Sequence, residues 1–257
     1  MERRPWSPNE LLVALDLYCR IPYSGIHARN EEIQNVAKHL GRTPSALAMK
    51  LSNFAAFDPI HQLRGIKGLK NGAKADEILM HEFLLNPEDT IRAASEAFQT
   101  LGIDKEIELS SPSEAELLFP LGPTETTRTV QVRLTQRFFR GVVLSSYDFQ
   151  CAFCALSIPE LLNASHIVPW KVNENLRSNP RNGLALCAIH DRAFDRGLVS
   201  IDESSRIVLS SQLKEHIGNN MFDTAFNKIK GEPVRVPRRF APEPENLTYH
   251  RDHIFRN

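Results

Sequence analysis

The sequence predicts an α+β protein in which a mainly helical N-terminal domain precedes a mixed domain with a metal site. Amphipathic helix patterns fill the first hundred residues, three of the four cysteines lie in the C-terminal half, and an acidic stretch separates the two parts. The hydrophobic fraction of 42% is normal for a globular chain of 257 residues. We expect a helical domain over 1–100, an acidic linker over 101–127 and a C-terminal domain over 128–257.

Strong helix signals open the N-terminal domain. In WSPNELLVALDLY, Ser7 is a cap, proline suits the first helical position, and Glu10 completes a capping box. A second amphipathic helix is predicted over EEIQNVAKHL, capped by Asn30 and ended by Gly41. Thr43 and the proline after it open a third helix. The sequence therefore predicts a unit of three helices.

The link between the second and third helices is only four residues long, GRTP. A turn this short that contains glycine is typical of a helix-turn-helix. We expect Asn53 to approach base edges and Arg42 and Lys50 to hold phosphates. The opening WS with the later GRTPSAL resembles a Myb or SANT three-helix unit, which implies DNA reading. The alternative is a helical packing or dimerisation module.

Charge is distributed unevenly although the formal net charge is zero. Residues 1–100 carry 12 Lys+Arg and 12 Asp+Glu, residues 101–127 carry 1 and 6, and residues 128–257 carry 18 and 13. An acidic spacer thus precedes a basic C-terminal part. This split suggests contact with a nucleic acid in the last section, although ordinary scatter of surface charge would also produce it.

A further helix is predicted from Thr129 to about Tyr147. Its arginines Arg133, Arg137 and Arg140 recur on the side opposite to the apolar residues. Arginines without matching acids are typical of a phosphate-binding face, and a merely solvated face is the alternative.

Cysteine and histidine form two spaced pairs in the C-terminal part. C-x2-C is followed after 32 residues by C-x2-H, which gives the set Cys151, Cys154, Cys187 and His190. Such ligands suit tetrahedral Zn²⁺, and clustered thiols in a reducing cytosol are more often metal ligands than disulfides. Cys19 lies in an apolar helical pattern and is expected in the core.

The segment between these pairs carries a recognisable order of residues. His166 lies in NASHIVPW, Asn182 follows in NPRNGLALC, and IHDRAFDRG comes next. This order resembles the HNH nucleases, specifically the restriction-type branch, over about residues 129–257. The resemblance implies a ββα-metal fold, one divalent cation and hydrolysis of DNA phosphodiester bonds.

The chemistry of such a reaction gives His166 a role. Hydrolysis needs a base to activate water, a cation to stabilise charge and a rigid scaffold, and an imidazole near pH 7 is a suitable base. A lone histidine in an apolar run is usually a core residue. Here the cysteines, Asn182, His190 and Asp191 at compatible positions favour a catalytic role for His166 instead. Asn182 is expected to orient the hairpin or His166 by hydrogen bonds, or to reach the metal.

One part of the site is open to two assignments. In HNH nucleases with a zinc knuckle, the eighth residue after the asparagine is usually a zinc cysteine and the ninth the metal-binding histidine. Here these are His190 and Asp191. We favour His190 on zinc and Asp191 on the catalytic cation. In the alternative, His190 completes the HNH set and zinc has three cysteines or is absent. Ser165 stands where the family often has an acid.

Together these features predict a restriction or defence endonuclease that cuts double-stranded DNA with Mg²⁺, Mn²⁺, Ni²⁺ or Co²⁺ and contains a structural Zn²⁺. The alternative is a zinc-stabilised DNA-binding regulator without cleavage activity. A homodimer is expected, because double-strand cutting by one HNH site usually needs two copies. The absence of a long apolar run and of a signal-peptide pattern favours a cytoplasmic location and no membrane partner.

Overall fold

The computed structural model describes three ranges of the chain, 4–63, 74–103 and 127–257, and gives only the backbone of residues 60, 63 and 127–134. Most of the expected acidic linker, residues 104–126, therefore lies outside the described part. Within the described ranges, no helix combines the length and hydropathy that a membrane span requires.

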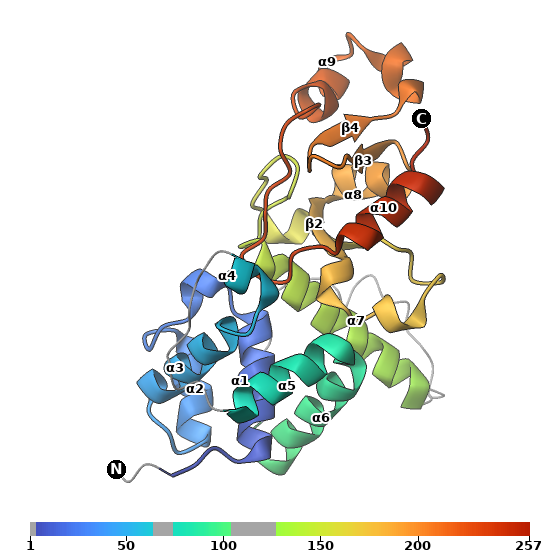
Figure 1. The fold of residues 1–257 in the computed structure, drawn as a ribbon. Helices are drawn as coiled ribbons and strands as arrows, with labels where there is room; N and C mark the ends of the chain where they lie inside the picture. The colour runs from blue at the N-terminus through green and yellow to red at the C-terminus, as the bar shows by residue number, and fades with distance from the viewer. Residues whose placement is uncertain (1–3, 64–73, 104–126) are drawn as a thin grey trace.

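The first helix begins where its capping residues predict. α1 (Pro8–Arg20) follows Ser7, whose hydroxyl accepts the Glu10 amide at 3.3 Å while the Glu10 carboxylate accepts the Ser7 amide at 2.8 Å. The apolar face of α1 is buried against α3, α6 and α7, so this helix lies at the centre of the N-terminal part (Figure 1).

The next two helices keep the predicted short connection. α2 (Glu31–His39) is capped by the Asn30 side chain and α3 (Pro44–Ala55) by the Thr43 hydroxyl. Gly41 adopts φ +60° in the link, a left-handed conformation that glycine takes without strain. The sharp turn therefore depends on the residue that predicted it.

Three more helices complete the N-terminal part: α4 (Pro59–Leu63), α5 (Lys74–Leu85) and α6 (Pro87–Thr100). The core between these helices is apolar and includes fully buried Leu15, Phe54 and Phe83. Apolar packing therefore joins these helices within the described ranges.

α7 (Thr127–Ser146) belongs to both halves of the molecule. Phe138 and Val142 pack into the core of the N-terminal helices, whereas Phe139 and Val143 pack into the C-terminal core. Since neighbouring helix positions point about 100° apart, one helix supplies both cores. The predicted boundary at residue 128 therefore falls at the start of a shared helix.

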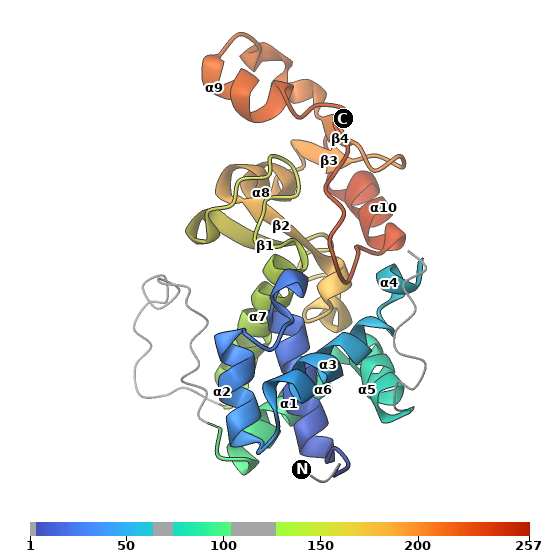
Figure 2. The same cartoon turned by 90° about the vertical axis from the view of Figure 1, so that its left-hand side faces the viewer.

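The C-terminal part contains a small hairpin followed directly by a helix. β1 (Leu162–His166) pairs antiparallel with β2 (Gly183–Cys187), which places His166 opposite Gly183. α8 (Ala188–Asp195) starts immediately after β2 and packs on both strands (Figure 2). This is a ββα arrangement, as the sequence resemblance implies.

Further elements surround this hairpin: β3 (Val199–Ile201), β4 (Ile207–Leu209), α9 (Asn220–Phe222) and α10 (Pro244–His253), with short 3-10 or π turns at Tyr23–Gly25, Pro159–Leu161, Glu174–Leu176, Pro180–Asn182, Ser211–His216 and Asp223–Asn227. β3 and β4 form a second two-stranded antiparallel sheet. Gly197 ends α8 at φ +69°, and a Cβ there would lie 2.0 Å from the Ile254 carbonyl oxygen. Only glycine allows α10 to approach this closely.

A buried arginine joins the two halves. Arg239 is 0% exposed, and its guanidinium donates to the carbonyl of Ile21 at 2.7 Å and to the Ser145 hydroxyl at 3.0 Å. The same group lies 4.7 Å from the centre of the Tyr18 ring. The extended segment before α10 is thereby fixed to α1 and α7.

Candidate active site and metal cluster

His166 is held at the end of β1 by contacts on several sides. Its ring stacks on Phe139 with centroids 3.9 Å apart at 8°, and Trp170 meets it edge-on at 5.5 Å. Its Nε2 lies 3.0 Å from the Arg177 carbonyl oxygen. These contacts fix the orientation of the imidazole.

The Arg177 contact also determines which nitrogen carries the proton. A carbonyl only accepts, so Nε2 of His166 must donate, and in the neutral ring Nδ1 is then the unprotonated nitrogen. Burial lowers the pKa of His166, and the Arg177 carbonyl and the Asp191 charge offset part of that effect. The ring is thus neutral near pH 7 and has a basic Nδ1.

Asn182 fixes the loop that follows β1. This residue is 0% exposed; its Oδ1 accepts the Val168 amide at 2.9 Å, and its Nδ2 donates to the carbonyls of Val168 and Leu176 at 3.0 and 3.2 Å. Both ends of the amide are occupied, so the structure favours hairpin orientation over metal binding among the roles that the sequence left open.

A cavity of about 670 Å³ opens beside His166 and is lined by residues of α7, β1, α8 and α10: Gln136, Arg137, Phe139, Arg140, Asn163, Ala164, Ser165, His166, Pro169, Trp170, Asp191, Asp195, His250 and Ile254. The predicted residues His166 and Asp191 therefore line one cavity. The Asp191 carboxylate accepts Asn163 Nδ2 at 2.8 Å. The Ser165 hydroxyl is buried there and has no hydrogen-bond partner among the described residues.

Sequence reasoning missed Asp195, a second carboxylate on the same wall. It lies one turn after Asp191 on α8, and the i, i+4 spacing in IHDRAFDRG is the signal that was available. Burial and the Asp191 charge raise the pKa of Asp195 to about 6, while Arg192 and Arg196 oppose the rise. Two neighbouring carboxylates of this kind form a region that favours positive charge.

The aromatic supports of His166 had no sequence signal. Phe139 adjoins the apolar residue of the predicted helix face, and Trp170 and Arg177 lie in an irregular loop. Gly183 explains the Phe139 stack, because a Cβ there would lie 2.4 Å from Val143 and 2.9 Å from the Phe139 ring. The glycine after Asn182 lets α7 pack directly on β2.

The four predicted zinc ligands come together. The ligand atoms of Cys151, Cys154, Cys187 and His190 all lie within 4.8 Å of one another. His190 Nδ1 is 3.2 Å from the Cys187 sulfur and 3.5 Å from the Cys151 sulfur, while its Nε2 donates to the Ala225 carbonyl at 2.8 Å. That carbonyl orients the ring with Nδ1 toward the sulfurs, as expected for a metal-ligating histidine. The residues therefore fit a tetrahedral cation.

The cluster also favours one of the two assignments of His190. Its ring faces the sulfurs, and the cavity around His166 is lined by Asp191 and not by His190. Burial lowers the pKa of His190, but hydrogen bonds to Cys151 and Cys187 outweigh it and raise the pKa to about 10. The arrangement supports His190 as a ligand of the sulfur cluster.

The structure corrects the expectation for two cations of the helix-turn-helix. Lys50 is 6% exposed and donates to both oxygens of Asp76 at 2.8 Å, so its charge is neutralised inside the protein. Arg42 pairs with Glu10 at 2.9 Å and lies over the Trp6 ring at 3.9 Å. Neither guanidinium nor ammonium is positioned to hold a phosphate in this structure.

Asn53 also contacts the carboxylate of the Lys50–Asp76 pair. Its Nδ2 lies 3.4 Å from Asp76 Oδ2, and its side chain is half-buried. The base-reading role expected for it therefore competes with an internal contact.

The arginines of α7 have different surroundings. Arg140 donates to the carbonyl of Leu162 at 2.7 Å and so ties α7 to β1. Arg137 is exposed and lines the His166 cavity. The side chain of Arg133 lies outside the described residues.

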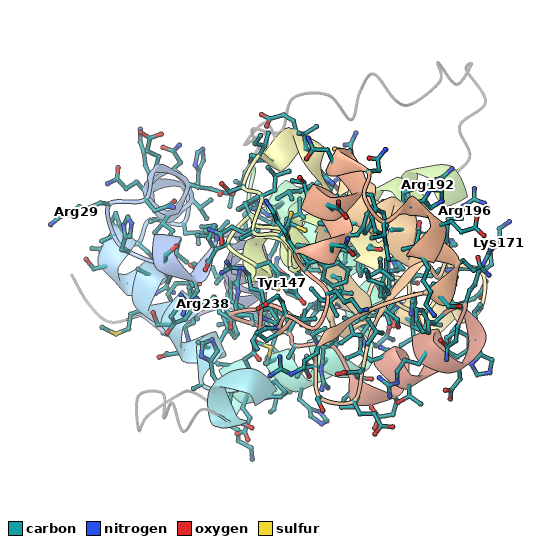
Figure 3. The ribbon with its side chains drawn as sticks, turned by 90° about the horizontal axis from the view of Figure 1, so that it is seen from above. Arg29, Tyr147, Lys171, Arg192, Arg196 and Arg238 are labelled. Atoms are coloured by element: carbon teal, nitrogen blue, oxygen red, sulfur yellow. The ribbon has the colours of Figure 1, made fainter. Side chains whose placement is uncertain are left out.

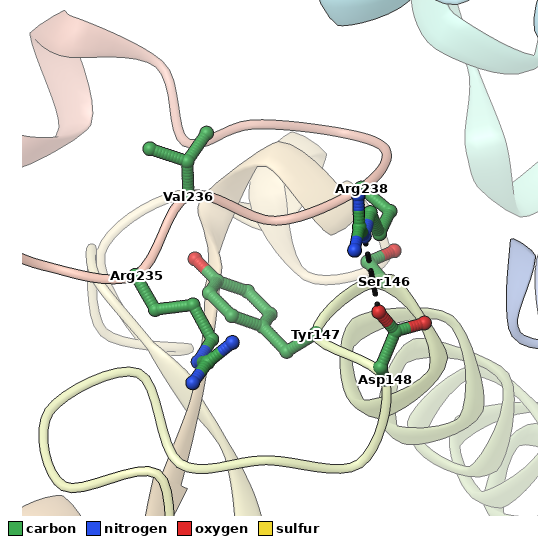
Figure 4. Close-up of a pocket in the computed structure, with 6 residues that line it drawn as sticks. All are labelled: Ser146, Tyr147, Asp148, Arg235, Val236 and Arg238. Carbon is green, nitrogen blue, oxygen red and sulfur yellow. Dashed lines mark hydrogen bonds and ion pairs between the residues drawn. The ribbon is translucent and has the colours of Figure 1, made fainter. Parts of the chain in front are cut away.

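A second, smaller cavity of about 220 Å³ lies at the end of α7, lined by Ser146, Tyr147, Asp148, Arg235, Val236 and Arg238 (Figure 4). Its carboxylate is already paired, because Asp148 accepts Arg238 Nε at 3.2 Å. It shares no lining residue with the first cavity and contains no histidine. The histidine and the carboxylates that could take part in acid–base or metal chemistry therefore line the first cavity.

The ββα unit combines a histidine-lined cavity with a Cys3His cluster that could hold a metal ion. Residues 151–202 match the model of the HNH endonuclease family, and this range includes both the cluster and His166. Over this range the chain is similar to that family, as the sequence resemblance indicates.

Other comparisons add little. A solved structure described as a modification dependent TagI restriction endonuclease aligns with a TM-score of 0.32 at 20% identity, over 45% of this chain and 37% of that chain. A TM-score this low establishes no common fold, and the alignment spans less than two thirds of that protein. The comparison with curated proteins gave no match.

Proposed function

We propose that this protein is a divalent-metal-dependent HNH endonuclease that hydrolyses phosphodiester bonds of double-stranded DNA. The observation that carries the proposal is the His166 ring, fixed on Phe139 and by the Arg177 carbonyl, which lines a cavity together with Asp191.

His166 acts as the general base. Its Nδ1 takes a proton from the attacking water, and the resulting imidazolium is stabilised by the Arg177 carbonyl at Nε2 and by the nearby Asp191 charge. Phe139 stacking prevents the ring from turning away. Asn182 keeps the loop after β1 closed and is a positioning residue.

Asp191 and Asp195 are the groups that would hold the catalytic cation. They project from successive turns of α8 into the cavity, and oxygen ligands suit Mg²⁺ and Mn²⁺, with Ni²⁺ and Co²⁺ as further candidates. When bound, such a cation neutralises charge on the phosphate and on the leaving oxygen. Asn163 orients Asp191 by its hydrogen bond.

Cys151, Cys154, Cys187 and His190 would hold a structural Zn²⁺. The first pair lies in the turn after α7 and the second at the junction of β2 and α8, so a shared ion would join the segment before β1 to the start of the helix that carries Asp191. The cluster offers four protein ligands and no position for a substrate, which is typical of structural zinc.

The test replaces His166 with alanine and compares single-turnover cleavage of a plasmid in Mg²⁺ or Mn²⁺. Loss of the general base is expected to slow cleavage by about 10²- to 10⁴-fold while DNA binding and the melting temperature are kept. His253→Ala is the matched control, since that histidine is exposed on α10. Equal rates for the parent and His166→Ala would refute the assignment.

The alternative function is a zinc-stabilised DNA-binding regulator without cleavage activity. It gives no reason for an oriented histidine facing a cavity with two carboxylates, so the geometry favours the nuclease. Incubation of plasmid DNA with the protein and Mg²⁺, Mn²⁺, Ni²⁺ or Co²⁺ separates the two, because the regulator leaves the plasmid intact under every condition.

DNA reading by the α2–α3 pair, a restriction or defence setting, a homodimer and a cytoplasmic location stay predictions. The short Leu40–Thr43 link supports a helix-turn-helix, whereas the internal pairing of Arg42 and Lys50 weakens its phosphate contacts. Arg137, exposed at the cavity, is the better-placed of the predicted phosphate ligands.

A further inference from the structure

α8 carries two kinds of charge at interleaved positions. Asp191 and Asp195 line the His166 cavity, and each is followed directly by an arginine, Arg192 and Arg196. Because successive helix residues point about 100° apart, the arginines form a stripe beside the acids and not among them. The helix therefore presents an acidic row to the cavity and a basic row next to it.

The basic row is not tied up in close ion pairs. Both arginines are exposed, and within the described part of the chain no hydrogen bond or close ion pair holds either guanidinium, although both lower the pKa of the neighbouring Asp195. Lys50 and Arg42 show the opposite situation, since each is hydrogen-bonded to an acid from another element. Guanidinium groups without such a close ion pair can still bind an anion from solution.

A third cation lies on the same side. Lys171 is exposed and directly follows Trp170, which lines the cavity. Figure 3 shows Arg192, Arg196 and Lys171 together at one edge of the molecule, with Arg29 at the opposite edge and Arg238 away from both. These three cations thus lie together on the side of the molecule where α8 and Trp170 line the cavity.

We propose that Arg192, Arg196 and Lys171, the basic rim, bind the phosphates of duplex DNA on either side of the bond that is cut. This inference rests on the proposed nuclease function and adds where the DNA lies. The two arginines lie about 6 Å apart along the α8 axis, and a duplex carries a phosphate about every 3.4 Å of its axis on each strand. Two phosphates of one strand, one or two nucleotides apart, are therefore within reach of the two long arginine side chains.

The location of the rim has a consequence for substrate binding. A strand held by α8 and the loop after Trp170 passes over the cavity, which brings a phosphate toward His166 and the two carboxylates. Attraction by the rim also offsets the repulsion between the phosphate and the acidic wall. On this proposal the C-terminal part makes these backbone contacts to the DNA.

The experiment measures binding of the full-length protein to a labelled duplex of about 25 base pairs by fluorescence anisotropy, without added divalent cation so that no cleavage occurs. The double variant Arg192→Ala/Arg196→Ala should bind about 10- to 100-fold more weakly at 100 mM salt. The slope of log K against log salt should flatten by about 1.8, since each lost phosphate contact removes about 0.9. Lys171→Ala should flatten it by about half as much.

The matched control is Arg29→Ala/Lys38→Ala, which removes two exposed cations, one in the turn before α2 and one on α2, and changes the net charge equally. It should leave the affinity within about twofold and the slope unchanged. Arg192→Lys/Arg196→Lys should keep the slope, which shows that the effect is one of charge. Melting temperatures of all variants check the fold.

The results separate this inference from the proposed function. If the control weakens binding as much as the rim variant does, or if the rim variant keeps the parent slope, the rim is not the DNA surface. If the rim binds DNA as expected but no cation supports cleavage, the inference holds and the proposed nuclease function fails.

Discussion

The three-helix unit and α8 both carry basic residues, but these residues differ in burial and in pairing. Both carry cations, yet Lys50 forms a buried ion pair with Asp76 whereas Arg192 and Arg196 are exposed and lie near the carboxylate of Asp195. In the first region an acid from a distant helix reaches the cation; in the second, the nearest acids face a cavity. A basic residue on a helix therefore indicates binding only once its partners in space are known.

The two regions also differ in what stabilises them. The N-terminal helices pack a large apolar core around Leu15, Phe54 and Phe83. The hairpin and α8 contain short elements, and their segments meet at the Cys3His cluster. Small units of this kind commonly depend on a metal for folding, so removal of the ion should affect the regions very differently.

The largest expected effect is loss of the metal. Cys151→Ser removes one ligand, and because on the order of 10 kcal/mol of zinc-binding free energy is folding free energy in small zinc domains, the C-terminal part should unfold. Elemental analysis should find about one zinc per chain in the parent and little in the variant. Far-UV circular dichroism should still show the helices of the N-terminal part.

The control for this change is Cys19→Ala, a buried cysteine in the apolar core of α1. It creates a small cavity and should cost only about 1 kcal/mol without loss of zinc. Parent protein that is free of zinc and yet fully folded would contradict the structural role of the cluster.

A smaller effect is expected from the buried ion pair of the helical region. Lys50→Met leaves the Asp76 carboxylate, which is 0% exposed, without its partner and should lower the free energy of unfolding by about 3–5 kcal/mol. The double variant Lys50→Met/Asp76→Leu should recover most of this loss in urea denaturation. Lys38→Ala, an exposed cation on α2, should change stability by less than about 0.5 kcal/mol.

DNA binding decides whether Lys50 is purely internal. The double variant restores folding without restoring the ammonium, so its affinity for duplex DNA should equal that of the parent. A tenfold loss of affinity in the folded double variant would return Lys50 to the phosphate-binding role that its position in the sequence suggested.

These contrasts show why some of the molecule could be predicted from sequence. Helix starts depend on adjacent residues, and Ser7 with Glu10 and Thr43 before proline marked them. The Cys3His set was also readable, because its spacing reflects the chemistry of one ion. Local rules and ligand chemistry act over short patterns that the linear chain displays.

Long-range contacts explain what the sequence did not show. The Lys50–Asp76 pair joins residues 26 positions apart, and the Phe139 ring reaches His166 from a separate helix. Asp195 repeats Asp191 after four residues, but only the cavity shows that both face His166. The role of Lys50, Phe139 and Asp195 depends on which distant residues they contact in the fold. A local sequence pattern does not specify those contacts.

The smallest expected effect is a difference between the two regions in how stability depends on pH. His250 in α10 is buried, with Nε2 on the Phe194 carbonyl at 3.1 Å and Nδ1 at the Ser200 hydroxyl at 2.9 Å. Burial lowers its pKa to about 4 from an ordinary value of 6.5, although the Phe194 carbonyl raises it somewhat. Between these values the unfolded chain binds the proton more readily than the folded one, so stability falls as pH drops from about 6.5 to about 4, by at most about 3 kcal/mol.

In the helical region, Glu10 makes stability depend on pH over a lower pH range. Burial alone would raise the pKa of Glu10, but hydrogen bonds from Arg42 and from the Ser7 amide lower it to about 2 from 4.5. A carboxyl group with a lowered pKa stabilises the fold above its unfolded value, and this contribution is lost as pH falls from about 4.5 to about 2. Urea denaturation at pH 7.5, 5.5 and 3.5 should therefore show His250→Gln reducing the loss of stability in both intervals, whereas Glu10→Gln reduces it only between pH 5.5 and 3.5. If Glu10→Gln also changes the loss between pH 7.5 and 5.5, or if His250→Gln leaves that interval unchanged, the two groups do not act in separate pH windows and the electrostatic contrast between them is wrong.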